Sequence, residues 1–240
     1  KKYKLDRKDG HFVKEQSPFS RLFNTISPRR CDNIVYFRQT IDVENIIKYI
    51  DINKKKVSML HILTAAIAKT VNKHENLNRY VYNGRIYQHK DLIISTIIKK
   101  ELSDNSPELI GKFKIKESDN INDISEKLTM DIKHIREEKD SDKFLQKLGT
   151  LSTPLFKILL GVLKFLIKID MYPKIINSLY PTYCSVFVAN LGSIGLEGVY
   201  HHLYEWGTCS VFVTMGVIKK QAVIVNNEIK IKDTCEIIFS

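Results

Sequence analysis

Cysteine is scarce in this chain of 240 residues, and the four cysteines lie far apart. No two of them form a Cys-x-x-Cys pair, and none clusters with histidine at the spacing of a metal site. This pattern excludes a zinc ribbon and a disulfide-stapled fold, and we expect no metal site. Three cysteines fall inside apolar, strand-like runs, where cysteine behaves as a small hydrophobic residue. We therefore expect buried thiols in a reducing, cytoplasmic compartment at Cys31, Cys184, Cys209 and Cys235.

An apolar run free of charge and long enough to cross a membrane is also missing. The most apolar segment, PLFKILLGVLKFLIKIDMY, contains Lys157, Lys164 and Lys168, whereas a spanning helix needs about 20 residues nearly clear of charge. On a helix these lysines form one narrow polar stripe. We expect the helix over 155–169 to lie in the core or at a subunit interface, with attachment to a membrane surface as the weaker alternative. The first 16 residues lack the apolar centre of a secretory signal.

Acidic residues are outnumbered, with 27 Asp and Glu against 38 Lys and Arg, which gives a formal net charge of +11. Such an excess is compatible with an anionic partner: a nucleic acid, a membrane surface or a phosphorylated ligand. The excess is mostly lysine, spread along the chain and interleaved with acids, whereas nucleic-acid readers gather arginine on one face. We therefore favour a solvated surface and expect no nucleic-acid partner.

The first half of the chain alternates strand and helix patterns. NIVYFRQTIDV alternates as a strand does, and the helical spacing over 43–55 follows it, with Asp42 placed to cap that helix. Ser58 is placed to cap a second helix over 59–74, on whose apolar face His61 is interpreted as a core histidine. Asn83-Gly84 predicts a hairpin, and a further strand is expected over 93–98.

The second half holds an amphipathic helix or helix pair over 119–147, then the apolar helix, and then only strands from Thr182 onward. A turn at Asn226-Asn227 separates QAVIV from EIKIK, and TCEIIF is expected as a final strand. No repeat, low-complexity tract or long linker divides the chain. We predict one α/β domain over 1–240 with a mixed or antiparallel sheet.

The stretch SVFVANLGSIGLEGVYHHLYEWGTCSVFVTMGVIKK is the most distinctive part of the sequence. Gly192, Gly195 and Gly198 predict a tight turn that leaves a strand. A dinucleotide-binding loop needs a helix directly after its glycines, and none is predicted here.

With its surroundings, this stretch resembles the catalytic domain of the 2-oxo acid dehydrogenase acyltransferases, relatives of chloramphenicol acetyltransferase. ANLGSIG is similar to the family's Ser-Asn-Leu-Gly-x-x-Gly turn, and CSVFVTMGVIKK to the strand after it. The segments over 17–50 and 57–87 are similar to the family's opening strand and two helices with the hairpin that follows. The resemblance implies a two-layer sandwich of a mixed β-sheet and helices, like chloramphenicol acetyltransferase.

The resemblance also implies a homotrimer that uses coenzyme A (CoA) in a channel between subunits. A histidine of that family takes the proton from the thiol of CoA or dihydrolipoamide, and a serine hydroxyl stabilises the oxyanion. This chain departs from the pattern twice. It stops at EIIFS, where the family's His-x-x-x-Asp-Gly motif is expected, and Ala189 occupies the place of the serine.

The resemblance and the residues together give the candidate site. His202 or His201 is the candidate base, and at most one of these neighbours can face a channel because side chains alternate along an extended segment. The competing interpretation gives both histidines a structural or solvent-facing role. The expected channel is lined by Ala189, Asn190, Ser193 and Trp206. We expect Asn190 to point to the other side of the strand from Ala189.

Two functions follow. The first is transfer of an acyl group between CoA and a thiol, hydroxyl or amine acceptor, with chemistry weakened by the two departures. The alternative is a non-catalytic trimeric module that keeps the acyltransferase fold and binds CoA or another ligand.

Overall fold

The computed structural model describes residues 5–54, 56–99, 108–137, 150–173, 176 and 180–240. Its main feature is a seven-stranded sheet with the order β2-β10-β8-β7-β5-β6, in which β9 also pairs with β10. The strands are β2 Phe37–Asp42, β5 Leu92–Lys99, β6 Glu108–Ile115, β7 Val186–Asn190, β8 Val211–Met215, β9 Lys219–Val225 and β10 Glu228–Phe239. The β5–β7 and β7–β8 pairs are parallel and the other pairs are antiparallel, so the sheet is mixed.

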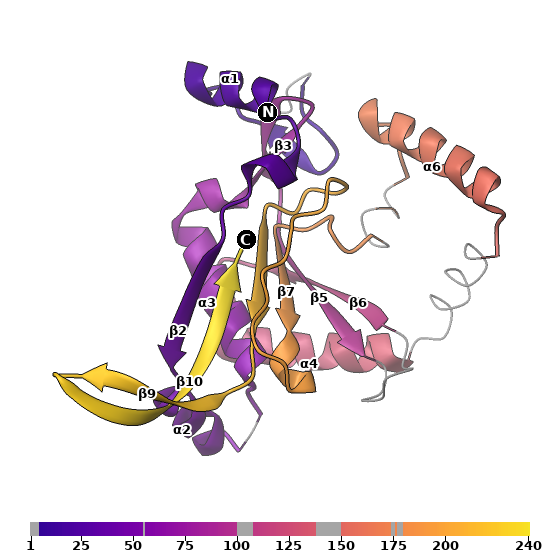
Figure 1. The fold of residues 1–240 in the computed structure, drawn as a ribbon. Helices are drawn as coiled ribbons and strands as arrows, with labels where there is room; N and C mark the ends of the chain where they lie inside the picture. The colour runs from indigo at the N-terminus through magenta and orange to yellow at the C-terminus, as the bar shows by residue number, and fades with distance from the viewer. Residues whose placement is uncertain (1–4, 55, 100–107, 138–149, 174–175, 177–179) are drawn as a thin grey trace.

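Two helices form the second layer of the sandwich (Figure 1). They are α3 Met59–Lys73 and α4 Ile121–Glu137. Their apolar faces pack with alternate residues of the central strands in the largest hydrophobic core, which includes Leu63 and Ile67 of α3 and Leu128 of α4. The predicted two-layer α/β sandwich with a mixed sheet is confirmed.

A small antiparallel sheet lies beside the large one. Its order is β1-β4-β3, with β1 Gly10–Phe12, β3 Arg79–Tyr82 and β4 Arg85–His89. The hairpin between β3 and β4 turns at Asn83 and Gly84, which both have positive φ, as predicted. Strand β1 was not predicted, because three residues are too few to show the alternation of apolar and polar residues that marks a strand.

Further α-helices in the described part of the chain are α1 Pro18–Ile26, α2 Glu44–Ile52 and α6 Thr153–Lys168. The cap of α2 is shifted from the expected position: Val43 is the N-cap residue, and Asp42 accepts a hydrogen bond from the Glu44 amide at 3.0 Å. The long helix expected over 119–147 is described as α4 to Glu137, and 138–149 lie outside the described residues. Among the helices that the structure describes, none is long and apolar enough to span a membrane.

Three sequence predictions need correction. Cys31 is exposed, because it follows an arginine in a short 3₁₀ turn at the surface; the other three cysteines are buried as expected. EIKIK and TCEIIF form one continuous strand, β10, which pairs first with β9 and then with β2 and β8. The prediction of only strands after Thr182 is wrong between β7 and β8. This segment contains a 3₁₀ turn, Leu191–Ile194, and then an irregular stretch to Ser210.

Candidate functional site

The central feature of the site is a gap between the parallel strands β5 and β7. Their pairing runs from Ile94 opposite Val186 to Thr96 opposite Val188 and then stops. Beyond this point β5 continues with β6 as far as Lys99, and β7 continues with β8 as far as Asn190. The two strands therefore separate at their carboxyl ends, which is where open α/β sheets bind ligands.

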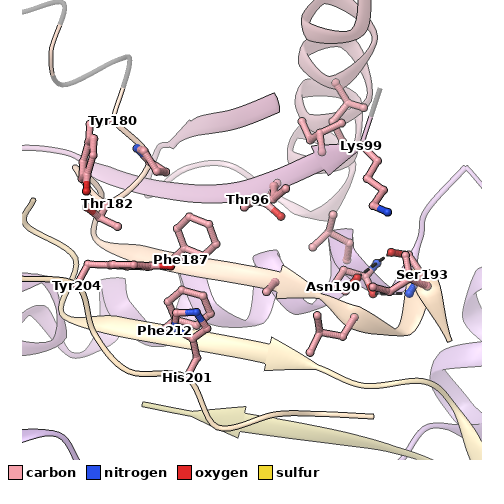
Figure 2. Close-up of a pocket in the computed structure, with 18 of the residues that line it drawn as sticks. Thr96, Lys99, Tyr180, Thr182, Phe187, Asn190, Ser193, His201, Tyr204 and Phe212 are labelled. Atoms are coloured by element: carbon pink, nitrogen blue, oxygen red, sulfur yellow. Dashed lines mark hydrogen bonds between the residues drawn. The ribbon is translucent and has the colours of Figure 1, made fainter. Parts of the chain in front are cut away.

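A cavity of about 580 Å³ occupies this gap (Figure 2). Its walls come from both sides of the sheet. Leu60 and Ile132 belong to the helix layer, whereas Phe187 and Phe212 belong to the apolar cluster on the opposite face. The volume lies within the range of about 300–1,000 Å³ that is usual for small-molecule sites.

The charged side chains that line the cavity are all cationic in the described part of the chain. Lys99 and Arg136 line it, and none of the described lining residues is an aspartate or a glutamate. Two cationic side chains on an apolar wall favour an anionic ligand, because the low-dielectric surroundings focus their field. Without a carboxylate among these residues, any proton transfer falls to a histidine, a lysine or a hydroxyl group.

The turn after β7 is built by glycines and by Asn190. The Asn190 side-chain oxygen Oδ1 accepts from the Ser193 amide at 3.2 Å, and the Ser193 hydroxyl donates to the Asn190 carbonyl at 2.7 Å (Figure 2). Gly195 ends the turn at φ +76°, a left-handed conformation that favours glycine. A Cβ at Gly192 would lie 2.6 Å from the Gly216 carbonyl oxygen, so the turn packs tightly against the end of β8.

Ala189, Asn190 and Ser193 all line the cavity. Ala189 and Asn190 were expected to point to opposite sides of the strand, yet both reach the cavity. Strand β7 ends at Asn190, and the gap beside it opens on both sides of the sheet, so consecutive residues reach the same space.

Of the two adjacent histidines, His201 lines the cavity; His202 is exposed and is not among the described lining residues. The His201 ring lies flat on Phe212, with centroids 4.1 Å apart and planes 3° apart. Its Nδ1 lies 2.7 Å from the His202 carbonyl oxygen, which can only accept, so Nδ1 carries a hydrogen. In the neutral ring Nε2 is then the nitrogen that accepts a proton.

Trp206 lies beside the cavity wall rather than in it. Its ring packs on Tyr180 at a centroid distance of 5.2 Å, and its Nε1 donates to the Tyr183 hydroxyl at 3.3 Å. Tyr180 itself lines the cavity, so the tryptophan supports the wall from behind.

A partly buried lysine holds the same wall. The Lys112 Nζ donates to the carbonyls of Tyr180 and Tyr183, at 2.6 and 3.1 Å. Burial lowers the pKa of Lys112 to about 8, and burial likewise raises the pKa of Tyr183 to about 12. These bonds fix the backbone on either side of Thr182, which also lines the cavity.

The lining residues that the sequence analysis did not predict include Thr96, Lys99, Arg136 and Tyr180. They come from β5, α4 and the segment before β7, so no local spacing joins them. The one available signal was the pair of hydroxyl residues, Ser95 and Thr96, inside the otherwise apolar run LIISTII. Among the residues that the structure describes, no group of three or more His, Cys, Asp or Glu side chains could hold a metal ion.

No protein-family model and no curated protein matches the sequence. Solved structures do match it. A probable dihydrolipoamide acetyltransferase from Listeria monocytogenes aligns at TM-score 0.57 and 14% identity, over 94% of this chain and 84% of that one. The cubic core of a pyruvate dehydrogenase multienzyme complex aligns at TM-score 0.55 and 10% identity, over 95% of this chain and 82% of the other.

This chain has the fold of those acyltransferase cores. The dihydrolipoamide acetyltransferase of Azotobacter vinelandii, whose catalytic mechanism was investigated through a serine, a histidine and an asparagine, aligns at TM-score 0.54 and 10% identity, over 95% of this chain and 82% of that one. The predicted resemblance in fold to the 2-oxo acid dehydrogenase acyltransferases is confirmed. At these identities the likeness establishes the fold and leaves the chemistry to the residues of the site.

Proposed function

We propose that this protein binds an acyl-CoA in the cavity between β5 and β7 and transfers the acyl group to a thiol, hydroxyl or amine acceptor. The observation that carries the proposal is the cavity itself, which lies at the carboxyl ends of two separating strands and is lined by cations without a carboxylate among its described residues. The solved structures that share the fold over nearly the whole chain are named acetyltransferases, which supports the same chemistry.

The charged and apolar parts of the cavity lining suit the charged and apolar parts of CoA. The phosphates of CoA would lie near Lys99 and Arg136, and its pantetheine arm would lie along the apolar walls that Phe187 and Phe212 provide. Lys99 and Arg136 are the lysine and arginine side chains of the described lining.

His201 is the proposed base. Its Nδ1–H is held by the His202 carbonyl, so Nε2 takes the proton from the acceptor. The acceptor atom attacks the thioester carbonyl carbon, the bond from carbon to sulfur breaks, and the proton passes from His201 to the CoA thiolate. The step needs no further reactant, because the proton taken from the acceptor is given to the CoA thiolate.

Ala189 favours the alternative function, a binding module without catalysis. A methyl group donates no hydrogen bond to an oxyanion, and removing one such donor from an active site costs about 2.7–4 kcal/mol of transition-state stabilisation. We therefore propose slow rather than fast acyl transfer, with the ligand-binding role as the second candidate.

A homotrimer is part of the proposal. The apolar face of α6 is uncovered in the single chain, with Ile158, Val162 and Phe165 each more than half exposed, and contiguous exposed apolar surface marks interaction sites. One neighbour in fold forms the cubic core of a multienzyme complex, so assembly occurs among proteins of this fold.

Calorimetric titration and a thiol-release assay test the function. CoA and acetyl-CoA should bind, more weakly at high salt because the phosphate contacts are screened. Acetyl-CoA with amine, hydroxyl and dithiol acceptors should release thiol slowly; His201→Gln should abolish the release, and the matched control His202→Gln should retain it. Binding without turnover would favour the binding module. Absence of binding at low salt would contradict the acyl-CoA site and a CoA-binding module alike.

A further inference from the structure

Thr96 carries a buried hydroxyl group with no hydrogen-bond partner. The residue is 2% exposed, and its Oγ1 meets no donor or acceptor. Buried hydroxyl groups in native proteins are nearly always paired, because an unpaired one has lost its water without replacement. A group retained in this state calls for an explanation, and an absent ligand is one.

The other unpaired buried side-chain atoms in the described chain belong to Asn24, Asn78 and Ser95. None of these three residues lines the cavity. Ser95 points to the opposite face of β5 from Thr96, where it lies against the Cys184 thiol. Thr96 therefore stands apart: its unpaired hydroxyl group belongs to a wall of the candidate site.

Thr96 is the last residue of β5 that pairs with β7 before the gap opens. Its register partner on β7 is Val188, and the next residue of that strand is Ala189. Figure 2 shows the Thr96 oxygen pointing from β5 toward β7, across the space that Phe187 and Asn190 also border. The hydroxyl group that Ala189 lacks on one side of the cavity is thus present, unpaired, on the other.

We infer that Thr96 donates its hydroxyl hydrogen to the carbonyl oxygen of an acyl group bound in the gap, and that this donor compensates in part for the one missing at Ala189. The inference rests on the proposed function. A carbonyl oxygen only accepts, so it complements a donor that has no other acceptor. When the acceptor attacks, this oxygen becomes negative and the same hydrogen bond strengthens.

Asn190 supplies a second donor. Its Oδ1 is engaged by the Ser193 amide, so its side-chain NH₂ is the end that can serve a ligand. Thr96 and Asn190 come from the two strands that separate, and the carbonyl oxygen would lie between them. A donor pair of this kind distinguishes an acyl-CoA from free CoA, which has no carbonyl at the sulfur.

The experiment is calorimetric titration of wild type, Thr96→Val and Thr96→Ser with acetyl-CoA and with CoA. Valine keeps the shape of threonine and removes the hydroxyl group. We expect Thr96→Val to bind acetyl-CoA about tenfold more weakly, the loss of one hydrogen bond, and to bind CoA as wild type does. Thr96→Ser should bind acetyl-CoA as wild type does, because it keeps the donor.

Thermal unfolding without ligand gives an independent reading. Thr96→Val should unfold at a higher temperature than wild type, because the variant no longer buries an unpaired polar group. Thr234→Val is the matched control: the Thr234 hydroxyl lies 2.7 Å from Gln221 Oε1 and 3.1 Å from the Lys219 carbonyl oxygen, so its loss should lower the midpoint. A lowered midpoint for Thr96→Val would mean that its hydroxyl group is already paired, and would overturn the inference.

The titrations separate an error in the role of Thr96 from an error in the proposed acyl-CoA function. If wild type and Thr96→Val bind acetyl-CoA equally, or if Thr96→Val weakens CoA as much as acetyl-CoA, the role of Thr96 is wrong and the proposed function stands. If wild type binds neither ligand, the proposed function is wrong and the role of Thr96 goes with it.

Discussion

Helices α3 and α6 are nearly equal in length, 15 and 16 residues, and both are rich in apolar side chains. Helix α3 buries six residues, among them Leu63 and Ile67, whereas α6 buries only Ile167. Figure 1 shows α3 packed along the large sheet and α6 set apart from it. An apolar helix is therefore not always buried within its own chain. Its burial depends on whether other elements of the chain pack against it.

The reason for the difference lies in the distribution of apolar residues. The apolar residues of α3 that pack on the sheet share one face. Those of α6 surround the helix except for the stripe of Lys157, Lys164 and Lys168, so one contact surface cannot cover them all. Its last turns pack with Tyr172 and Tyr183, and the rest lies open.

The largest expected effect is in the core beneath α3. Leu63→Ala should lower the free energy of unfolding by about 2–5 kcal/mol, because it removes buried methyl groups and leaves a cavity. The matched variant on α6, Leu159→Ala, should change it by less than about 0.5 kcal/mol in dilute protein, because Leu159 is 42% exposed. Urea unfolding followed by circular dichroism measures both. Equal losses would show that α6 is packed within the single chain.

The next effect concerns association through α6. The double variant Val162→Lys and Phe165→Lys should weaken the proposed trimer by at least about 100-fold, because it places charge on the exposed apolar face. The folded monomer should keep its unfolding midpoint. Sedimentation equilibrium gives the mass of each species. Lys157→Glu, on the polar stripe of the same helix, is the control and should leave the mass unchanged; a monomeric wild type would refute the trimer.

The smallest expected effect compares the two helix caps. The Ser58 hydroxyl oxygen accepts from the His61 amide, and the His61 ring Nδ1 accepts from the Ser58 amide, whereas Ser152 at the start of α6 makes no side-chain cap bond. Ser58→Ala should therefore cost about 1 kcal/mol of unfolding free energy, and Ser152→Ala should cost close to nothing. Chemical unfolding at pH 7 resolves a difference of this size. A similar cost at both positions would mean that the caps act through backbone propensity rather than through the bond.

Local features were predictable because their causes are local. The turns at Asn83-Gly84 and Asn226-Asn227 require positive φ, which these residue types tolerate, and both turns have it. The Ser58 cap and the buried His61 follow from one turn of helix and its apolar face. The resemblance to acyltransferases was likewise carried by motifs along the chain, and the fold bears it out.

The candidate site was only partly predictable. Ala189, Asn190 and Ser193 lie together because one strand and one turn hold them, so a motif contains them all. Which of His201 and His202 enters the cavity depends on the irregular stretch after that turn, and Trp206 lies outside the lining for the same reason. The position of Thr96 opposite them depends on how far two strands, distant in sequence, remain paired.

The sequence by itself determined the α/β class, the hairpin turns, the Ser58 cap and the apolar helix faces, because each arises from interactions between residues a few positions apart. Tertiary structure alone decided three things: the point at which β5 and β7 separate, the set of side chains that face the resulting cavity, and the exposure of α6. Strand order and helix docking depend on contacts between distant segments. No spacing within one segment can encode them.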